Sequence, residues 1–117
     1  MAKEIIIDTD VGDDVENELA IALALRSEAI AVTGITTVYD EVEIRARLAA
    51  KILETAGRSD IPVACGARDP LKNRPKRMDW IHEQARVLDE TTYEDVISDL
   101  PAHEFIRDAA MAGETPL

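Results

Sequence analysis

The sequence predicts an α/β fold: a Rossmann-like, three-layer arrangement in which a parallel sheet of three or more strands is flanked by helices. Short β-branched runs alternate with helical patterns in the order strand, helix, strand, helix, strand, which is typical of parallel sheets with right-handed crossovers. Hydrophobic residues make up 46% of the chain and aromatic residues 3%, so we expect an aliphatic core of helices packed on a sheet. The 117 residues fit a single domain, residues 1–117.

The first half of the predicted sheet lies before residue 40. The β-branched run Ile5–Ile7 is typical of a strand that is buried on both faces. A run of Leu, Ala and Ile at 19–25 contains strong helix formers and predicts a nearly buried helix that begins at residues 15–17. Ile30–Val38 is the second expected strand, and Gly34 within it indicates a close approach of another group or a bulge.

The second helix is expected from Asp40, its cap, to about Ala56, where Gly57 would end it. Apolar residues recur every four positions and predict one buried stripe, made of Ile44, Leu48, Ile52 and Ala56. The basic residues fall outside the stripe and are expected on the solvent-facing side: Arg45, Arg47 and Lys51. A third strand is expected at Ile61–Cys65, and a last helix at Ala102–Ala112.

Charge and cysteine content limit the partners that the chain is expected to have. The 24 acidic and 13 basic residues give a formal net charge of −11, which repels phosphate backbones and anionic lipids, so we expect neither nucleic acid nor a membrane as partner. One cysteine excludes an internal disulfide, and the sequence begins without a secretory signal, so a cytoplasmic location is expected. The open edges of a three-stranded sheet predict either a homo-oligomer or a piece of a longer protein.

An acidic loop follows the first predicted strand. Four aspartates lie within seven residues around Gly12: Asp8, Asp10, Asp13 and Asp14. In open parallel sheets ligands bind beyond the carboxyl ends of the strands, and Ca²⁺ prefers several carboxylate oxygens. The alternative is that the aspartates cap the next helix and interact with its dipole. The spacing leaves both interpretations open.

Three blocks of the sequence resemble the nucleoside hydrolases, enzymes that cleave the N-glycosidic bond of ribonucleosides. The first block is Ile5–Asp14, which contains Asp8-Thr9-Asp10-Val11-Gly12, the second is Gly34–Val38, and the third is Ile61–Gly66 with the following Pro70-Leu71. The blocks come in the order of the family and at about its spacing. The resemblance therefore implies that the chain corresponds to the N-terminal part of a nucleoside hydrolase.

This resemblance implies a calcium-dependent site and a ribonucleoside substrate. The residues that match the metal ligands of the family are Asp8, Asp10 and Asn17, and Asp10 also matches the base that activates water. The residues that match substrate-binding positions are Asp14, Glu16, Glu41 and His82. A water on a metal ion has a lowered pKa, so a carboxylate beside it can take its proton near neutral pH.

The sequence also departs from the family pattern. The family has two adjacent aspartates before its Ala-Leu-rich helix, and this chain has Glu16-Asn17 there when the helices are aligned. After the second strand it has the bulkier and more acidic Tyr39-Asp40-Glu41 in place of a small polar turn. The enzymes of the family are also much longer than this chain. Two functions are therefore carried forward: a nucleoside hydrolase of impaired activity, or a non-catalytic α/β domain that acts in self-association or as a scaffold.

Overall fold

The structure is a computed structural model that describes residues 2–72, 84–88, 90 and 93–113. Its central sheet consists of three parallel strands in the order β1-β2-β3. The strands are β1 (Lys3–Thr9), β2 (Ile30–Thr37) and β3 (Val63–Cys65), and the helices are α1 (Val15–Arg26), α2 (Val42–Thr55) and α4 (Ala102–Ala112), with a short 3₁₀ helix η1 (Ala85–Val87). The predicted alternation of strands and helices is confirmed.

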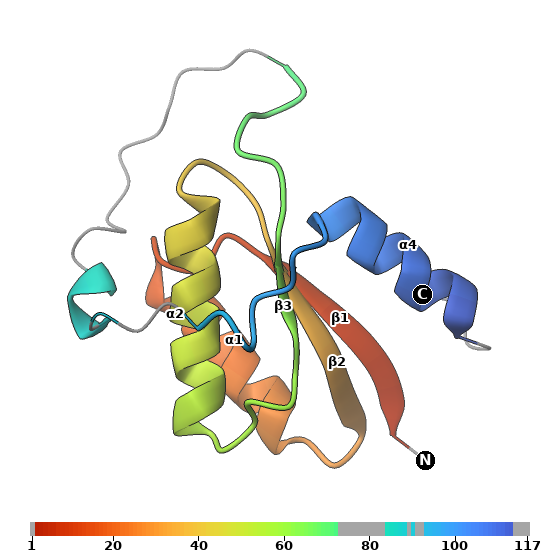
Figure 1. Ribbon diagram of the computed structural model, residues 1–117. Helices are drawn as coiled ribbons and strands as arrows, with labels where there is room; N and C mark the ends of the chain where they lie inside the picture. Colours follow the sequence, from red (N-terminus) through yellow and green to blue (C-terminus); the bar gives the residue numbers. More distant parts are fainter. Residues whose placement is uncertain (1, 73–83, 89, 91–92, 114–117) are drawn as a thin grey trace.

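The helices form the two outer layers, with α1 and α2 on one face of the sheet and α4 on the other (Figure 1). Successive right-handed crossovers that move in the same direction across a sheet place their helices on one face, which accounts for α1 and α2 lying side by side. The segment that contains Val96 and Ile97 runs beside β3, since the Val63 N–H donates to the Val96 carbonyl at 3.0 Å. The free edge of β1 has no paired strand among the described residues.

Between the sheet and the helices α1 and α2 lies an aliphatic core, which includes Ile21, Ile35, Ala49 and Leu53. Two expectations about burial were wrong. The isoleucines of β1 are half-buried because β1 is an edge strand. Helix α1 buries Ile21 and Ala24 and exposes Leu19 and Leu23, so it is not the nearly buried helix that its composition predicted.

Gly34 combines both features that were expected of it. The register of the β1–β2 pair shifts between Ile5 and Ile6, where Ile5 lies opposite Val32 and Ile6 opposite Gly34. A Cβ atom on Gly34 would lie 2.5 Å from Cε1 of Phe105 in α4. The glycine therefore marks a bulge and also lets α4 pack closely on the sheet.

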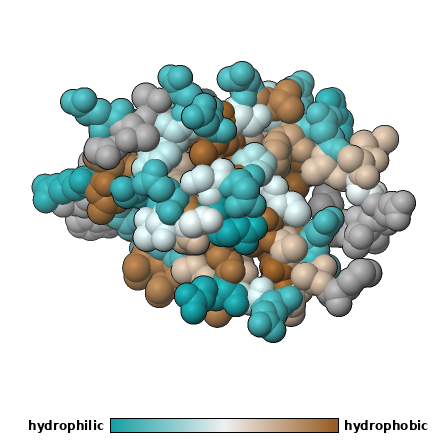
Figure 2. Space-filling model, turned by 60° about the horizontal axis from the view of Figure 1, so that its bottom comes forward, coloured by the Kyte–Doolittle hydropathy of each residue, from teal (hydrophilic) through white to brown (hydrophobic). Residues whose placement is uncertain are grey.

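The second helix ends as expected but begins differently. Gly57 has a φ of 70° directly after the C-cap, the left-handed conformation that glycine adopts most readily. At the other end Glu41, not Asp40, occupies the N-cap position, and Asp40 has a φ of 55°. On the face of the molecule shown in Figure 2, apolar side chains form scattered patches between hydrophilic ones. None of the helices within the described ranges is long and apolar enough to cross a lipid bilayer.

Candidate functional site

The acidic loop, residues 8–14, lies at the carboxyl end of β1. Parallel strands end at the same edge of a sheet, so this loop lies next to the segment that follows β2. A hydrogen bond joins the two segments, from the Val38 N–H to the Thr9 carbonyl at 3.1 Å. Gly12 has a φ of 124°, which a residue with a side chain rarely adopts. The glycine thus allows the chain to turn from β1 into α1, and the site lies at the edge predicted for this fold class.

Two polar contacts position the carboxylates that the sequence singled out as metal ligands. The Asn17 side-chain amide donates to Oδ1 of Asp10 at 2.8 Å. The Thr36 hydroxyl donates to Oδ1 of Asp8 at 2.7 Å, across the register pair that these residues form. The structure thus brings Asp10 and Asn17 together from the end of a strand and the start of a helix, while the described contact of Asp8 is with Thr36.

The predicted substrate-binding residues that the structure describes lie at the starts of α1 and α2. Asp14 and Glu16 are exposed. Asp14 occupies the N-cap position of α1 but makes no side-chain capping hydrogen bond, so helix capping is not the role of this aspartate. Glu41 is half-buried, and its carbonyl accepts the N–H of Arg45 at 3.0 Å. His82 lies outside the described residues.

Arg45 corrects the prediction that the basic residues of α2 face solvent. Its side chain is 0% exposed, and its guanidinium donates to the carbonyls of Asp10 at 2.8 Å, Val11 at 3.2 Å and Tyr39 at 2.7 Å. It also pairs with the carboxylate of Asp13 at 3.3 Å. A buried charge is tolerated where it is paired and hydrogen-bonded, and the acidic loop supplies most of these partners.

The roles of Arg45 and Thr36 were not predicted from the sequence, and Asp13 was expected only as one of the four aspartates of the acidic loop. A signal for Arg45 was present, because it lies three residues after Val42 and four before Ala49, both of which are buried. A helix face that contains those residues points to the sheet. Thr36 could not be predicted as the partner of Asp8 in this way, because the pairing depends on the register of β1 against β2. The bulge near Gly34 shifts that register by one residue.

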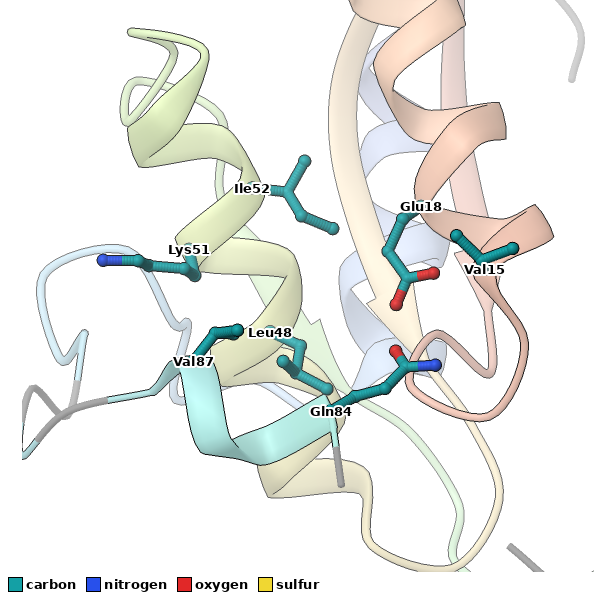
Figure 3. Close-up of a pocket in the computed structure, with 7 residues that line it drawn as sticks. All are labelled: Val15, Glu18, Leu48, Lys51, Ile52, Gln84 and Val87. Carbon is teal, nitrogen blue, oxygen red and sulfur yellow. The ribbon is translucent and has the colours of Figure 1, made fainter. Parts of the chain in front are cut away.

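A hollow lies between α1 and α2, away from the contacts of the acidic loop, and η1 closes one end of it (Figure 3). It has a volume of about 350 Å³, and its lining is formed by Val15, Glu18, Leu48, Lys51, Ile52, Gln84 and Val87. The side chains of Glu18 and Gln84 point toward one another, while the amine of Lys51 points away (Figure 3). Burial raises the pKa of the Glu18 carboxyl, and the charge of Asp14 adds to this effect.

The donor atoms of the acidic loop suit a hard cation in chemical type. Carboxylate and amide oxygens are the ligands that Ca²⁺ takes, and the Asn17 amide carries such an oxygen besides the N–H that donates to Asp10. Across the described ranges, however, no group of three or more Asp, Glu, His or Cys side chains could hold a metal ion. The loop thus offers part of a coordination shell.

Comparisons with known proteins agree on one family. The sequence profile of a family described as inosine-uridine preferring nucleoside hydrolase matches residues 5–116. A probable uridine nucleosidase 2 from Arabidopsis thaliana is 42% identical over 84 residues, which cover 68% of this chain and 26% of the relative. The pyrimidine-specific ribonucleoside hydrolase RihA of Shewanella woodyi is 40% identical over 84 residues, which cover 70% of this chain and 26% of the relative.

A solved structure titled inosine-guanosine nucleoside hydrolase has the same fold. Its TM-score with this chain is 0.78 at 24% sequence identity, and the similarity covers 98% of this chain and 35% of that one. The chain spans about a quarter of the length of the curated relatives that it matches.

Proposed function

The chain belongs to the inosine-uridine preferring nucleoside hydrolase family, and on that premise we propose that its acidic loop is the N-terminal part of a calcium-dependent site for ribonucleosides. The reaction is hydrolysis of the N-glycosidic bond. The observation that carries the proposal is the hydrogen bond of 2.8 Å between Asn17 and Asp10. It joins a proposed metal ligand from the start of α1 to the proposed catalytic carboxylate after β1.

In this proposal Asp8, Asp10 and Asn17 hold the calcium ion. Ca²⁺ takes six to eight oxygen ligands, and the two aspartates each supply a carboxylate oxygen. When bound, calcium lowers the pKa of a coordinated water and so makes it a better nucleophile. Asp10 takes the proton of the attacking water, because a carboxylate held by a neutral amide donor keeps its position while it accepts a proton. Asn17 orients that carboxylate through the amide contact.

Ribose recognition is assigned to exposed or half-buried acidic residues around the loop. Asp14 and Glu16 lie at the start of α1, and Glu41 lies at the start of α2. Carboxylates accept hydrogen bonds from sugar hydroxyls and also stabilise the positive charge of an oxocarbenium-like transition state. His82 is proposed for the nucleobase side of the substrate.

We further propose that the activity of this chain is impaired. Asn17 contributes no negative charge where the family pattern has an aspartate, and the side chain of Glu16 is one methylene longer than that of aspartate. A displacement of a reacting or binding group by about 1 Å can reduce a rate on the order of a hundredfold. The Glu16-Asn17 pair therefore weakens both metal binding and ribose positioning.

Thermal unfolding with and without calcium tests this site. A ligand that binds the folded state stabilises it by about 2.7 kcal/mol at a hundred times its dissociation constant. Calcium is expected to raise the melting temperature of the wild type and of Asp60→Ala, whose aspartate is exposed and pairs with Arg58 away from the loop. Asp10→Ala should show no such rise. Equal stabilisation of Asp10→Ala and the wild type would place the ion elsewhere.

A second function, self-association of a non-catalytic domain, is favoured by one observation. Helix α1 exposes Val15 at 62%, Leu19 at 62% and Leu23 at 73%, and these residues recur every four positions along one side of the helix. The edge of β1 that has no paired strand among the described residues is a surface for strand addition in the same assembly. We propose a homo-oligomer that covers this side of α1.

Sedimentation measures this association. The wild type is expected to be larger than a monomer, and Leu23→Lys is expected to shift it to monomer. Met111→Lys is the control, because Met111 is 82% exposed but lies on α4, on the other face of the sheet. A wild type that stays monomeric at high concentration removes the self-association proposal and leaves the calcium site untouched.

A further inference from the structure

We propose that Arg45 is a positioning residue that holds the acidic loop in the geometry at which Asp10 can act. The inference rests on the proposed calcium site, and it assigns a role to a residue outside the acidic loop. Arg45 is in the first turns of α2, 35 residues from Asp10. Its guanidinium nevertheless contacts the backbone of Asp10 directly.

The contacts of Arg45 fix the backbone directly after the proposed catalytic residue. Nη1 donates to the carbonyl of Asp10 at 2.8 Å and to that of Val11 at 3.2 Å. Two consecutive peptide groups are therefore held by one planar group. The Asp10 Cα, which carries the side chain, is bonded to the first of these peptide groups, so the Arg45 contacts and the Asn17 amide at 2.8 Å act together on the position of the carboxylate.

The same guanidinium also joins the acidic loop to the segment after β2. Nε donates to the carbonyl of Tyr39 at 2.7 Å, and the Tyr39 ring lies 5.7 Å from the guanidinium carbon, within the range of a cation–π interaction. Tyr39 and Asp40 have positive φ values of 79° and 55°, a conformation that costs free energy for such residues. These contacts compensate for part of that cost and hold the segment that leads to Glu41.

The charge of Arg45 is balanced within this group of contacts. Asp13 accepts from Nη2 at 3.3 Å, and its carboxylate is 13% exposed. The other oxygen, Oδ1, is buried and has no hydrogen-bond partner among the described residues. Asp13 is thus the counter-ion of a fully buried guanidinium, which distinguishes it from the aspartates that are proposed to meet the metal ion.

Lysine could not replace this arginine. Three directions of donation are used at once, toward the acidic loop, toward Tyr39 and toward Asp13. A guanidinium provides five N–H groups in a rigid plane, whereas an ammonium is a compact group on a flexible chain. Arg45→Lys keeps the charge but can satisfy fewer of these directions, so it separates positioning from charge.

The test compares Arg45→Met and Arg45→Lys with Leu53→Ala, a variant of a fully buried leucine on the same helix. All are titrated with calcium by calorimetry at a temperature where circular dichroism shows them folded. Groups that orient metal ligands typically change metal affinity by about 10–100-fold when they are removed. Arg45→Met is therefore expected to weaken calcium binding by about tenfold or more, Arg45→Lys to fall between it and the wild type, and Leu53→Ala to stay within about twofold.

Amide hydrogen exchange provides a readout that does not depend on calcium. The Asn17 N–H donates to the carbonyl of Asp14 in the acidic loop at 3.4 Å, and the N–H groups of Tyr39 and Asp40, in the segment after β2, are hydrogen-bonded at 2.9 and 2.8 Å. Their exchange should become faster in Arg45→Met relative to amides of β2, and not in Leu53→Ala.

The two readouts separate failure of this inference from failure of the proposed function. If the wild type binds no calcium but exchange increases selectively in Arg45→Met, the calcium site is wrong and the positioning role stands. If Leu53→Ala loses as much calcium affinity as Arg45→Met, or if exchange rises uniformly, the role of Arg45 is merely structural and the inference is overturned.

Discussion

The contact between Gly34 and Phe105 gives the sharpest test of how α4 is attached to the sheet. Gly34→Ala adds one methyl group whose carbon would lie 2.5 Å from Cε1 and 2.6 Å from Cζ of Phe105. Carbon atoms pack at about 3.5–4.0 Å, so the methyl group and the ring overlap by about 1 Å or more. The next atom, the carbonyl oxygen of Pro62, is at 3.7 Å, an ordinary contact. The ring is therefore the group that must move.

The expected cost follows from this geometry. Overpacking of a well-packed region costs about 1–3 kcal/mol. Against this cost, replacing glycine by alanine within a strand gains about 0.5–1 kcal/mol, since alanine loses less conformational freedom on folding. Gly34→Ala should therefore destabilise the wild type by roughly 1–2 kcal/mol. In a Phe105→Ala background, where the ring is absent, the same substitution should stabilise the protein by about 0.5–1 kcal/mol.

Urea unfolding of the four proteins in this double-mutant cycle, followed by far-ultraviolet circular dichroism, measures the coupling. The expected coupling free energy between the two positions is about 1.5 kcal/mol or more. The effect of Gly34→Ala on the free energy of unfolding should change sign when the ring is removed. Residues that do not touch give additive effects within about 0.3–0.5 kcal/mol. If Gly34→Ala has the same effect with and without the ring, α4 does not pack on β2 through this contact.

Two further predictions concern polar residues of α1. Asn17→Asp adds a ligand charge beside Asp10 and should strengthen calcium binding by about tenfold, because ligand charge tunes the affinity of such sites. If calorimetry finds weaker or unchanged binding, the assignment of Asn17 as a ligand is wrong. Burial raises the pKa of Glu18, so the folded state holds this proton more tightly than the unfolded state, and stability is lost as the pH rises through the folded pKa. Glu18→Gln should therefore have a higher melting temperature than the wild type at neutral pH, and the difference should close below the ordinary glutamate pKa of about 4.3. A difference that does not change with pH would show that the carboxyl is not buried as described.

Most of the fold could be predicted from the sequence because its signals are local. The β-branched residues of β2 predicted a strand within one residue of its observed end, and the helix at Ala102–Ala112 has the predicted bounds. Burial was less predictable, because it depends on what packs against each element. A run of Leu and Ala predicts a helix equally well whether one side or all sides are covered, so the exposed Leu19 and Leu23 of α1 could not be inferred from their own segment.

The site divides in the same way. The acidic loop and its place after the first strand follow from motif and topology, and the Asn17–Asp10 contact links residues that are close in sequence. Arg45 was assigned to the solvent side because charge is the stronger local signal, although its buried neighbours Val42 and Ala49 indicate the opposite. Its partners in the acidic loop lie more than thirty residues away in the sequence, and only the folded chain brings them within reach.

Calorimetric titration with calcium decides whether the acidic loop binds that ion through Asp10, as proposed. Saturable heat from one calcium ion per chain is expected in the wild type and in Asp60→Ala, and this heat should be lost in Asp10→Ala. An absence of heat in the wild type at saturating calcium, or unchanged heat in Asp10→Ala, would contradict the proposed site.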